Sequence, residues 1–245
     1  MDVGNIGAQI ERLTRQGDGK LVEIDGVEYS TTPLHDPRKP EHIPETVVVH
    51  TLQGLADLVK GDDDEAYREI RGLFVHVESP TQVRLCTGIF GPFNQRAVLA
   101  TAMAIVPPLQ LGQHMDQETF VVHVLCAYEP TEARDRVLKL AGNLTSEAVQ
   151  TLADDGVTQR ATARAGLVKV ANVEVENPVE LRPYRSFGEV EQVDSPFILR
   201  LRGGGGDRPP TCALFECDGG RWRLEAIQRV KAWLLGELPG VALYG

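Results

Sequence analysis

The segment that most constrains the fold of this chain is residues 195–240, where turn-forming residues separate every expected element. Residues 197–202 and 211–217 are short apolar runs that predict two strands, and the glycine- and proline-rich stretch between them is typical of a hairpin tip. Asp218-Gly219-Gly220 then predicts a turn into a helix over residues 221–236. The order strand, hairpin, strand, helix can therefore be read directly, but it brings no nucleophile, metal cluster or phosphate loop with it.

The rest of the chain alternates between strand-like and helix-like segments. Strands are expected at residues 21–24, 27–30, 45–50, 73–78, 82–86, 96–106, 167–170 and 173–176, and helices at residues 6–13, 51–60, 116–128, 131–141 and 145–154. Residues 96–106 would also suit a helix, and residues 120–122 would also suit a strand. This order predicts an α+β fold of antiparallel sheets with helices packed on one side, closed by a β-hairpin and a helix. An N-terminal helix, hairpin and proline-rich arm (1–45), a first α+β unit (46–112) and a C-terminal unit (113–245) are expected, the last two forming either two domains or one.

Composition and charge narrow the class of protein. The chain has 245 residues and a formal net charge of -10, so nucleic acid repels it at long range and is a less favoured partner. The four cysteines form no CxxC pair, which predicts free thiols in a reducing compartment. No apolar run approaches the ~18 residues of a membrane span, and the residues after Met1 lack the pattern of an export signal. A cytoplasmic protein without a membrane partner is expected.

The residues that often carry chemistry do not assemble into a catalytic or metal-binding pattern. His123 and Cys126 share a helix face, but a zinc site needs three or four ligands, so a packed histidine beside a buried thiol is the favoured interpretation. Asp116 and Glu118 are better explained by helix capping. No catalytic residue, metal or cofactor is therefore assigned, and enzymatic activity stays an open alternative.

Arginines dominate the candidate ligand contacts. Arg200 and Arg202 lie two residues apart on one strand face, where they either line a phosphate site or form the solvent face. The expected helix after Asp218-Gly219-Gly220 has free amides at its start, which can bind an anion, although an ordinary turn explains the same residues. The candidate ligand-binding residues are Asn94, Arg96, Arg200, Arg202, Arg221 and Arg223.

A family resemblance rests on the order and spacing of segments. The segments are the helix at residues 52–59, the strand at 73–78, the segment at 116–128, the helical region at 134–154, the stretch Asn177-Pro178-Val179-Glu180-Leu181, and the strand at 197–202 that leads to the closing hairpin and helix. In this order the chain resembles, over most of residues 46–240, an uncharacterised family of tailed-phage and prophage proteins. The resemblance implies a phage-encoded protein in the host cytoplasm. It supplies no catalytic residues, and such proteins are often encoded among phage recombination or early genes.

These observations support several functional hypotheses from different classes. The first is a non-enzymatic, homo-oligomeric binding protein that sequesters a small anionic ligand of the nucleotide type, such as a signal of host defence. In this hypothesis the N-terminal helix and the arm at residues 31–44 clamp subunits together. The alternatives are an accessory protein of phage DNA recombination or replication, a metal-assisted hydrolase, and a virion structural or assembly protein.

Overall fold

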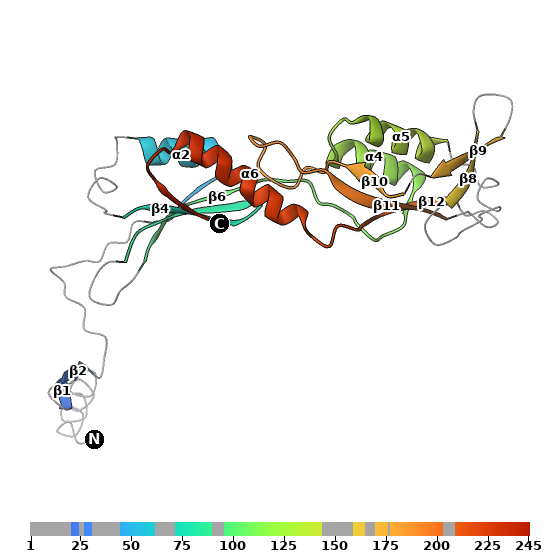
Figure 1. Ribbon diagram of the computed structural model, residues 1–245. Coiled ribbons are helices and arrows are strands. Elements are labelled where there is room, and N and C mark those ends of the chain that lie inside the picture. Colours follow the sequence, from blue (N-terminus) through green and yellow to red (C-terminus); the bar gives the residue numbers. More distant parts are fainter. Residues whose placement is uncertain are drawn as a thin grey trace, which may run out of the picture. The chain divides into compact units, whose positions relative to one another are not determined.

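The computed structural model describes residues 21–24, 27–30, 45–61, 72–89, 96–143, 159–164, 170–175, 177–202 and 209–245 (Figure 1). The chain divides into two compact units, Met1–Ile43 and Pro44–Gly245. In the first unit, β1 (Leu21–Ile24) and β2 (Val27–Ser30) form an antiparallel pair, which confirms the hairpin predicted from their alternating residues. The helix expected at residues 6–13 and the proline-rich arm at residues 31–44 lie outside the described residues.

The second unit contains a five-stranded sheet in the order β13-β4-β5-β6-β3. Its strands are β3 (Val47–Val49), β4 (Phe74–Ser79), β5 (Gln82–Cys86), β6 (Val98–Met103) and β13 (Ala242–Tyr244). The three central strands are antiparallel, whereas each edge strand runs parallel to its neighbour. The expected antiparallel pairing therefore holds at the centre of this sheet, and the two edges differ from it.

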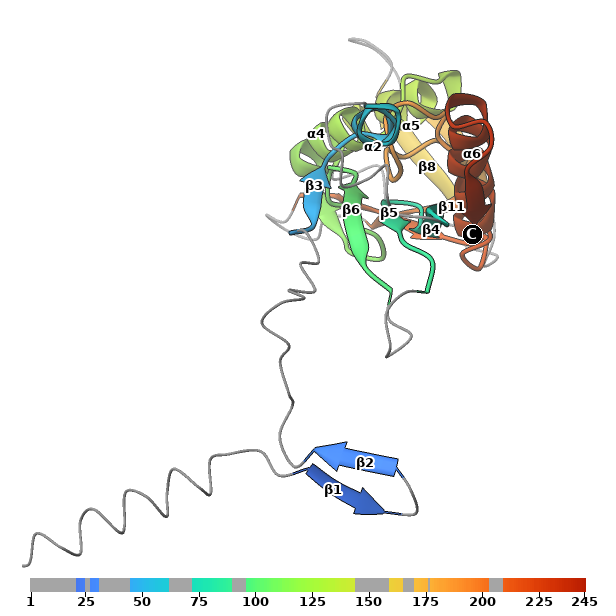
Figure 2. The ribbon, with the colours of Figure 1, turned by 90° about the vertical axis from the view of Figure 1, so that its left-hand side faces the viewer.

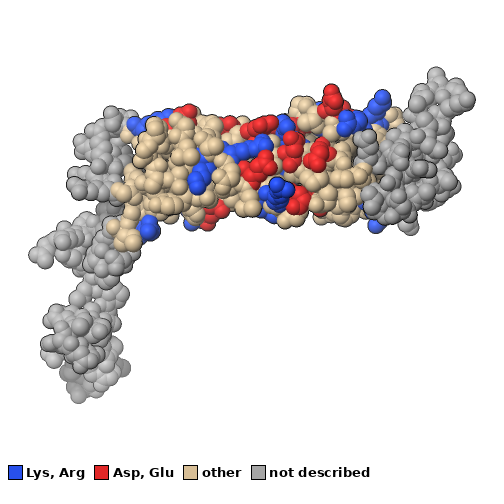
Figure 3. Space-filling model, in the orientation of Figure 1, with Lys and Arg blue, Asp and Glu red and all other residues tan. Residues whose placement is uncertain are grey.

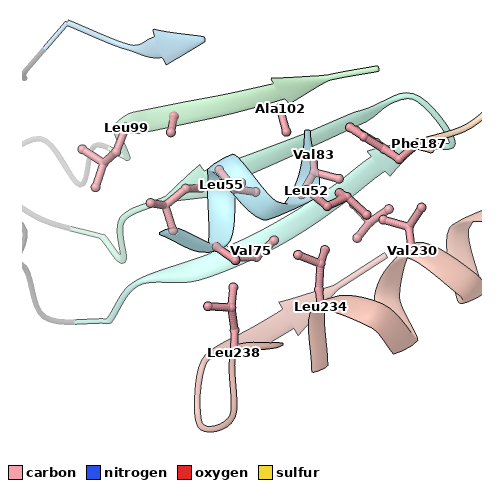
Figure 4. Packing of buried hydrophobic residues seen from close by; sticks show 14 of the residues in the cluster. Leu52, Leu55, Val75, Val83, Leu99, Ala102, Phe187, Val230, Leu234 and Leu238 are labelled. Carbon is pink, nitrogen blue, oxygen red and sulfur yellow. The ribbon is translucent and has the colours of Figure 1, made fainter. Parts of the chain in front are cut away.

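Two helices cover one face of this sheet, α2 (Leu52–Lys60) and α6 (Trp222–Glu237). Leu52 and Leu55 of α2 and Leu234 of α6 are fully buried in one core with Val75 and Val83 of the central strands (Figure 4). Side chains alternate between the two faces of a strand, so the intervening residues point away from this core. Figure 2 shows no described helix on that opposite side of the sheet.

A second sheet has four antiparallel strands in the order β10-β11-β12-β7. Its strands are β7 (Met115–Asp116), β10 (Val179–Leu181), β11 (Ser195–Arg202) and β12 (Thr211–Glu216), and the helices packed on it are α4 (Gln117–Ala127) and α5 (Glu132–Gly142). Phe120, Val124 and Val137 of the helices share a core with Leu199 and Leu214 of the strands. A separate antiparallel pair, β8 (Gln159–Arg164) and β9 (Val170–Val175), follows α5 in the sequence. The α+β class predicted from the sequence is confirmed, including the closing hairpin and helix.

The starts of three helices follow from local capping. The side chains of Thr51, Asp116 and Thr131 each accept a hydrogen bond from the backbone N–H three residues later, at 3.0 to 3.1 Å. Such bonds satisfy amides that have no partner inside the helix. The three helix starts predicted at these residues are confirmed.

Some sequence predictions differ from the structure. The buried face of α4 consists of Phe120, Val124 and Ala127, whereas Leu125 is 49% exposed. Residues four and three apart share a helix face, and Leu125 lies about 100° around the axis from Val124. Strand β13 was not expected at all. The helix expected at residues 145–154 lies outside the described residues.

A loop built around Gln192 runs from the four-stranded sheet into the core of the five-stranded sheet. The buried Gln192 side chain accepts hydrogen bonds from the backbone of Arg185 and Ser186, both at 3.0 Å. Its amide nitrogen donates to the carbonyl oxygens of Phe187 at 3.0 Å and Val190 at 3.2 Å. Phe187 and Val190 pack with the core of the five-stranded sheet, so this one side chain fixes the loop that enters it.

Candidate ligand-binding surface

The face of the five-stranded sheet that α2 and α6 leave uncovered carries a row of residues set by strand register. Tyr244 pairs with His76, His76 with Arg84, Arg84 with Thr101, and Thr101 with Val48. Residues directly opposite each other in a sheet point to the same side. The row, together with Phe74 two residues before His76, defines what we call the helix-free face.

Aromatic rings and a guanidinium group meet at one end of the helix-free face. The ring of Phe74 lies 5.4 Å from that of Tyr244 in an edge-to-face arrangement, and Tyr244 is 58% exposed. The guanidinium carbon of Arg96 lies 5.1 Å from the centre of the Phe74 ring, within the range of a cation–π contact. Paired hydrogen bonds between Thr87 and Ala97 hold the backbone next to Arg96.

The described side chains of this face include more positive than negative charges. Arg84 forms an ion pair with Glu78 at 2.9 Å, and both side chains are more than one third exposed. Arg96 adds a second guanidinium next to the aromatic pair. An exposed arginine beside exposed ring surface can hold an anion through its forked N–H groups and a flat group through stacking. The face therefore suits a ligand that carries both an anionic group and a flat ring.

The structure does not bring the six predicted ligand residues together. Arg96 lies on the helix-free face, whereas Arg200 and Arg202 lie on β11 of the other sheet and Arg221 and Arg223 at the start of α6. Phe197 of β11 pairs with Glu216, which lies near the start of α6. Arg202 is five residues further along β11, a distance of about 17 Å at the spacing of residues in a strand. Asn94 lies outside the described residues.

The amides predicted to bind an anion at the start of α6 are already paired with Asp218. Its carboxylate accepts hydrogen bonds from the backbone of Gly220 at 2.8 Å and of Trp222 at 3.1 Å. Both glycines of the turn have positive φ, 66° at Gly219 and 82° at Gly220, which explains their place in the sequence. An external anion would have to displace this carboxylate before it could use the same amides.

Beside this helix start lies a buried polar cluster that the sequence did not predict. The guanidinium of Arg185 donates to Glu216 and to the Ser195 hydroxyl, and it lies 3.8 Å from the ring centre of Trp222. Burial lowers the pKa of Arg185, and the bond to Glu216 opposes that shift. Because the charge is paired and enclosed, we interpret the cluster as structural.

Three polar atoms near this cluster have no hydrogen-bond partner among the described residues. They are Tyr128 Oη, Arg185 Nε and Trp222 Nε1. Tyr128 is fully buried, and burial raises the pKa of its phenol well above the usual value. A buried donor without an acceptor lowers stability, so this region is where single substitutions are most informative.

Within the described part of the chain, no group of three or more histidine, cysteine, aspartate or glutamate side chains is placed to hold a metal ion. His123 Nε2 accepts a hydrogen bond from the backbone N–H of Gln110 at 3.3 Å, and burial lowers the pKa of His123. Cys126 is exposed on the same helix. His123 is thus engaged with a neighbouring loop, as the packing interpretation expected, but the Cys126 thiol, which was expected to be buried, is exposed.

The four thiols are free, two of them buried and two exposed. Burial raises the pKa of Cys86 and raises that of Cys212 to about 12. Burial and the nearby Asp218 also raise the pKa of Cys217. These three thiols stay protonated at neutral pH, whereas an activated cysteine nucleophile needs a lowered pKa.

A scan against protein-family models, a search of curated proteins and a search of solved structures each find no match to this chain. The resemblance to the phage protein family therefore stays a prediction. Among the described helices, none combines the length and the apolar composition needed to cross a bilayer.

Most residues of the helix-free face were not selected from the sequence. Phe74, His76 and Arg84 lie at alternate positions of two expected strands that only a short turn separates, so their common face could have been predicted from the sequence. The position of Tyr244 on this face could not be predicted, because Tyr244 belongs to β13, which is distant in the sequence from the strand that it pairs with.

Proposed function

We propose that this chain is a non-enzymatic binding protein whose helix-free face holds a small anionic ligand with a planar ring, as in nucleotides. The observation that carries the proposal is the placing of Arg96, Phe74 and Tyr244 next to each other on an uncovered sheet face. Stacking of a base on an aromatic side chain contributes about 1–3 kcal/mol, and an arginine fork adds a charge-assisted contact to phosphate.

The same surface suits a small ligand better than a long nucleic acid. Among the described positions of the face, Arg84 and Arg96 are the arginines, and Arg84 is already paired with Glu78. On the side where α6 lies, Figure 3 shows acidic and basic side chains interspersed, with no continuous basic track. Binding to a phosphate backbone gains affinity with each phosphate neutralised, so a face with two arginines provides little of that gain.

Thermal unfolding in the presence of ligand tests the proposal. The probes are nucleoside mono-, di- and triphosphates and cyclic dinucleotides, each added to the intact protein. A probe at 100 times its dissociation constant stabilises the folded state by about 2.7 kcal/mol. Arg96→Ala and Tyr244→Ala should each weaken binding of the active probe by about 5- to 150-fold, the range that 1–3 kcal/mol represents.

Arg221→Ala is the matched control, because Arg221 is an exposed arginine at the start of α6 and away from this face. It should bind the probe as the wild type does. If no probe shifts the unfolding temperature, the proposal loses its support. If Arg221→Ala abolishes binding and Arg96→Ala does not, the site lies at the helix start instead.

A further inference from the structure

The helix-free face holds a second guanidinium group close to its aromatic end. Arg84 of β5 lies directly opposite His76, which is two residues along β4 from Phe74. Arg84 and Phe74 are therefore diagonal neighbours on one face of an antiparallel pair, and such neighbours are about 7–8 Å apart. A long arginine side chain can span this distance, so Arg84 lies within reach of a ligand whose ring stacks beside Phe74.

The electrostatics of Cys86 also place Arg84 and Arg96 near the same point of the face. Cys86 pairs with Phe74 in register and so lies on the same side of the sheet. Burial raises the pKa of Cys86, and the positive charges of Arg84 and Arg96 both oppose that rise. Because such effects weaken with distance, both guanidinium groups lie near this thiol and hence near the aromatic end.

The ion pair of Arg84 still allows the side chain to bind an anion. Its Nε lies 2.9 Å from a carboxylate oxygen of Glu78, and among the described residues Arg84 has no other ion pair. A guanidinium held at Nε can still present its terminal N–H groups, which are the fork that matches a phosphate. Glu78 thus orients Arg84, while its own negative charge opposes the approach of an anion.

We propose that the ligand of the helix-free face carries two phosphate groups, one bound by Arg96 and the other by Arg84, with its ring at Phe74 and Tyr244. The inference rests on the proposed function and narrows the ligand from any anionic ring compound to a nucleotide with a second phosphate. A single phosphate engages one guanidinium group, whereas a second phosphate adds a charge-assisted contact at the other.

Calorimetric titration of the intact protein with matched nucleotides tests the inference. The probes are the 5′-monophosphate, the 5′-diphosphate and the 3′,5′-bisphosphate of adenosine and of guanosine. A probe with two phosphates should bind about tenfold more tightly than the monophosphate of the same base, because a charge-assisted contact contributes about that factor. Arg84→Ala should remove this difference and bind the monophosphate as the wild type does, which also shows that the variant is folded.

Glu78→Gln should change the affinity in the opposite direction. Glutamine keeps an oxygen that can accept a hydrogen bond from Nε of Arg84, and it removes the charge that opposes the ligand. Binding of the two-phosphate probe should tighten by about two- to fivefold, in keeping with the small energy of an exposed ion pair. Glu118→Gln is the matched control, because Glu118 is exposed on α4, which belongs to the other core, and its replacement changes the net charge equally. It should bind the probes as the wild type does.

The possible results separate this inference from the proposed function. A monophosphate that binds as tightly as both two-phosphate probes overturns the inference and leaves the proposed function standing. An Arg84→Ala protein that keeps the preference for two phosphates has the same consequence, and so has an equal gain in Glu118→Gln and Glu78→Gln. If none of the probes binds, the proposed function is wrong and the inference falls with it.

Discussion

Replacing Tyr128 with phenylalanine should stabilise the protein, because the hydroxyl that it removes is buried and has no hydrogen-bond partner among the described residues. The ring of Tyr128 packs edge-on against Phe197 at 6.0 Å and against His123 at 6.1 Å, and phenylalanine keeps both contacts. An unsatisfied hydroxyl costs about 1–3 kcal/mol, whereas the space left by one oxygen atom costs less than about 1 kcal/mol. The net gain should be about 1 kcal/mol, which raises the Tm of a chain of this size by about 2–4 °C.

Calorimetry and urea unfolding at neutral pH measure this change. Tyr244→Phe is the control, since that side chain is exposed and its replacement should change the free energy of unfolding by less than about 0.5 kcal/mol. A loss of about 1 kcal/mol in Tyr128→Phe, with the control unchanged, would refute the reasoning. It would mean that a bound water molecule or another polar group satisfies the hydroxyl.

The same residue gives a dependence on alkaline pH. Burial raises the pKa of Tyr128 in the folded state above its unfolded value of about 10. The folded state then holds a proton that the unfolded state releases, so stability is complete below about pH 10 and falls as the pH rises above it. Tyr128→Phe should therefore lose less stability above pH 10 than the wild type in urea unfolding.

Two further predictions concern the loop around Gln192. Arg182 donates to both carboxylate oxygens of Asp194, at 3.0 and 2.7 Å, and these bonds lower the pKa of Asp194. The contribution of this pair to the stability of the folded protein is therefore present above about pH 4 and is lost as the pH falls. Asp194→Asn should lose about 1 kcal/mol or less at pH 7, because the side chain is 49% exposed, and should show a flatter acid limb in thermal melts. Gln192→Ala removes four buried hydrogen bonds and should cost about 2–4 kcal/mol in urea unfolding, with the exposed Gln228→Ala unchanged; an equal effect in both would contradict it.

Helix starts and hairpins were predictable because their causes lie within a few residues. Helices begin at Thr51, Asp116 and Thr131, because each of these side chains accepts a hydrogen bond from the backbone N–H three residues later. The pairing of β4 with β5 follows from two alternating segments separated by a short turn.

The parallel edges of the five-stranded sheet were not predictable in this way. β13 pairs with β4, which comes from the opposite end of the unit in the sequence. Nothing in residues 242–244 themselves predicts which strand they pair with. The same holds for the polar cluster, since Arg185, Glu216 and Trp222 come from three segments and meet only in the folded chain. For a related reason, the sequence did not predict that the candidate arginines lie far apart. Strand register, and not distance along the sequence, decides which side chains share a face of a sheet.

The late position of α6 and β13 also sets an order for folding during synthesis. Residues 115–216 supply the four-stranded sheet and the two helices of its core, so every residue of this core is synthesised before residues 230–244. The five-stranded sheet cannot close until residues 230–244 emerge, because Val230, Leu234 and β13 come last. Until then β4 is an unprotected edge, and a nascent chain that stalls there is exposed to aggregation.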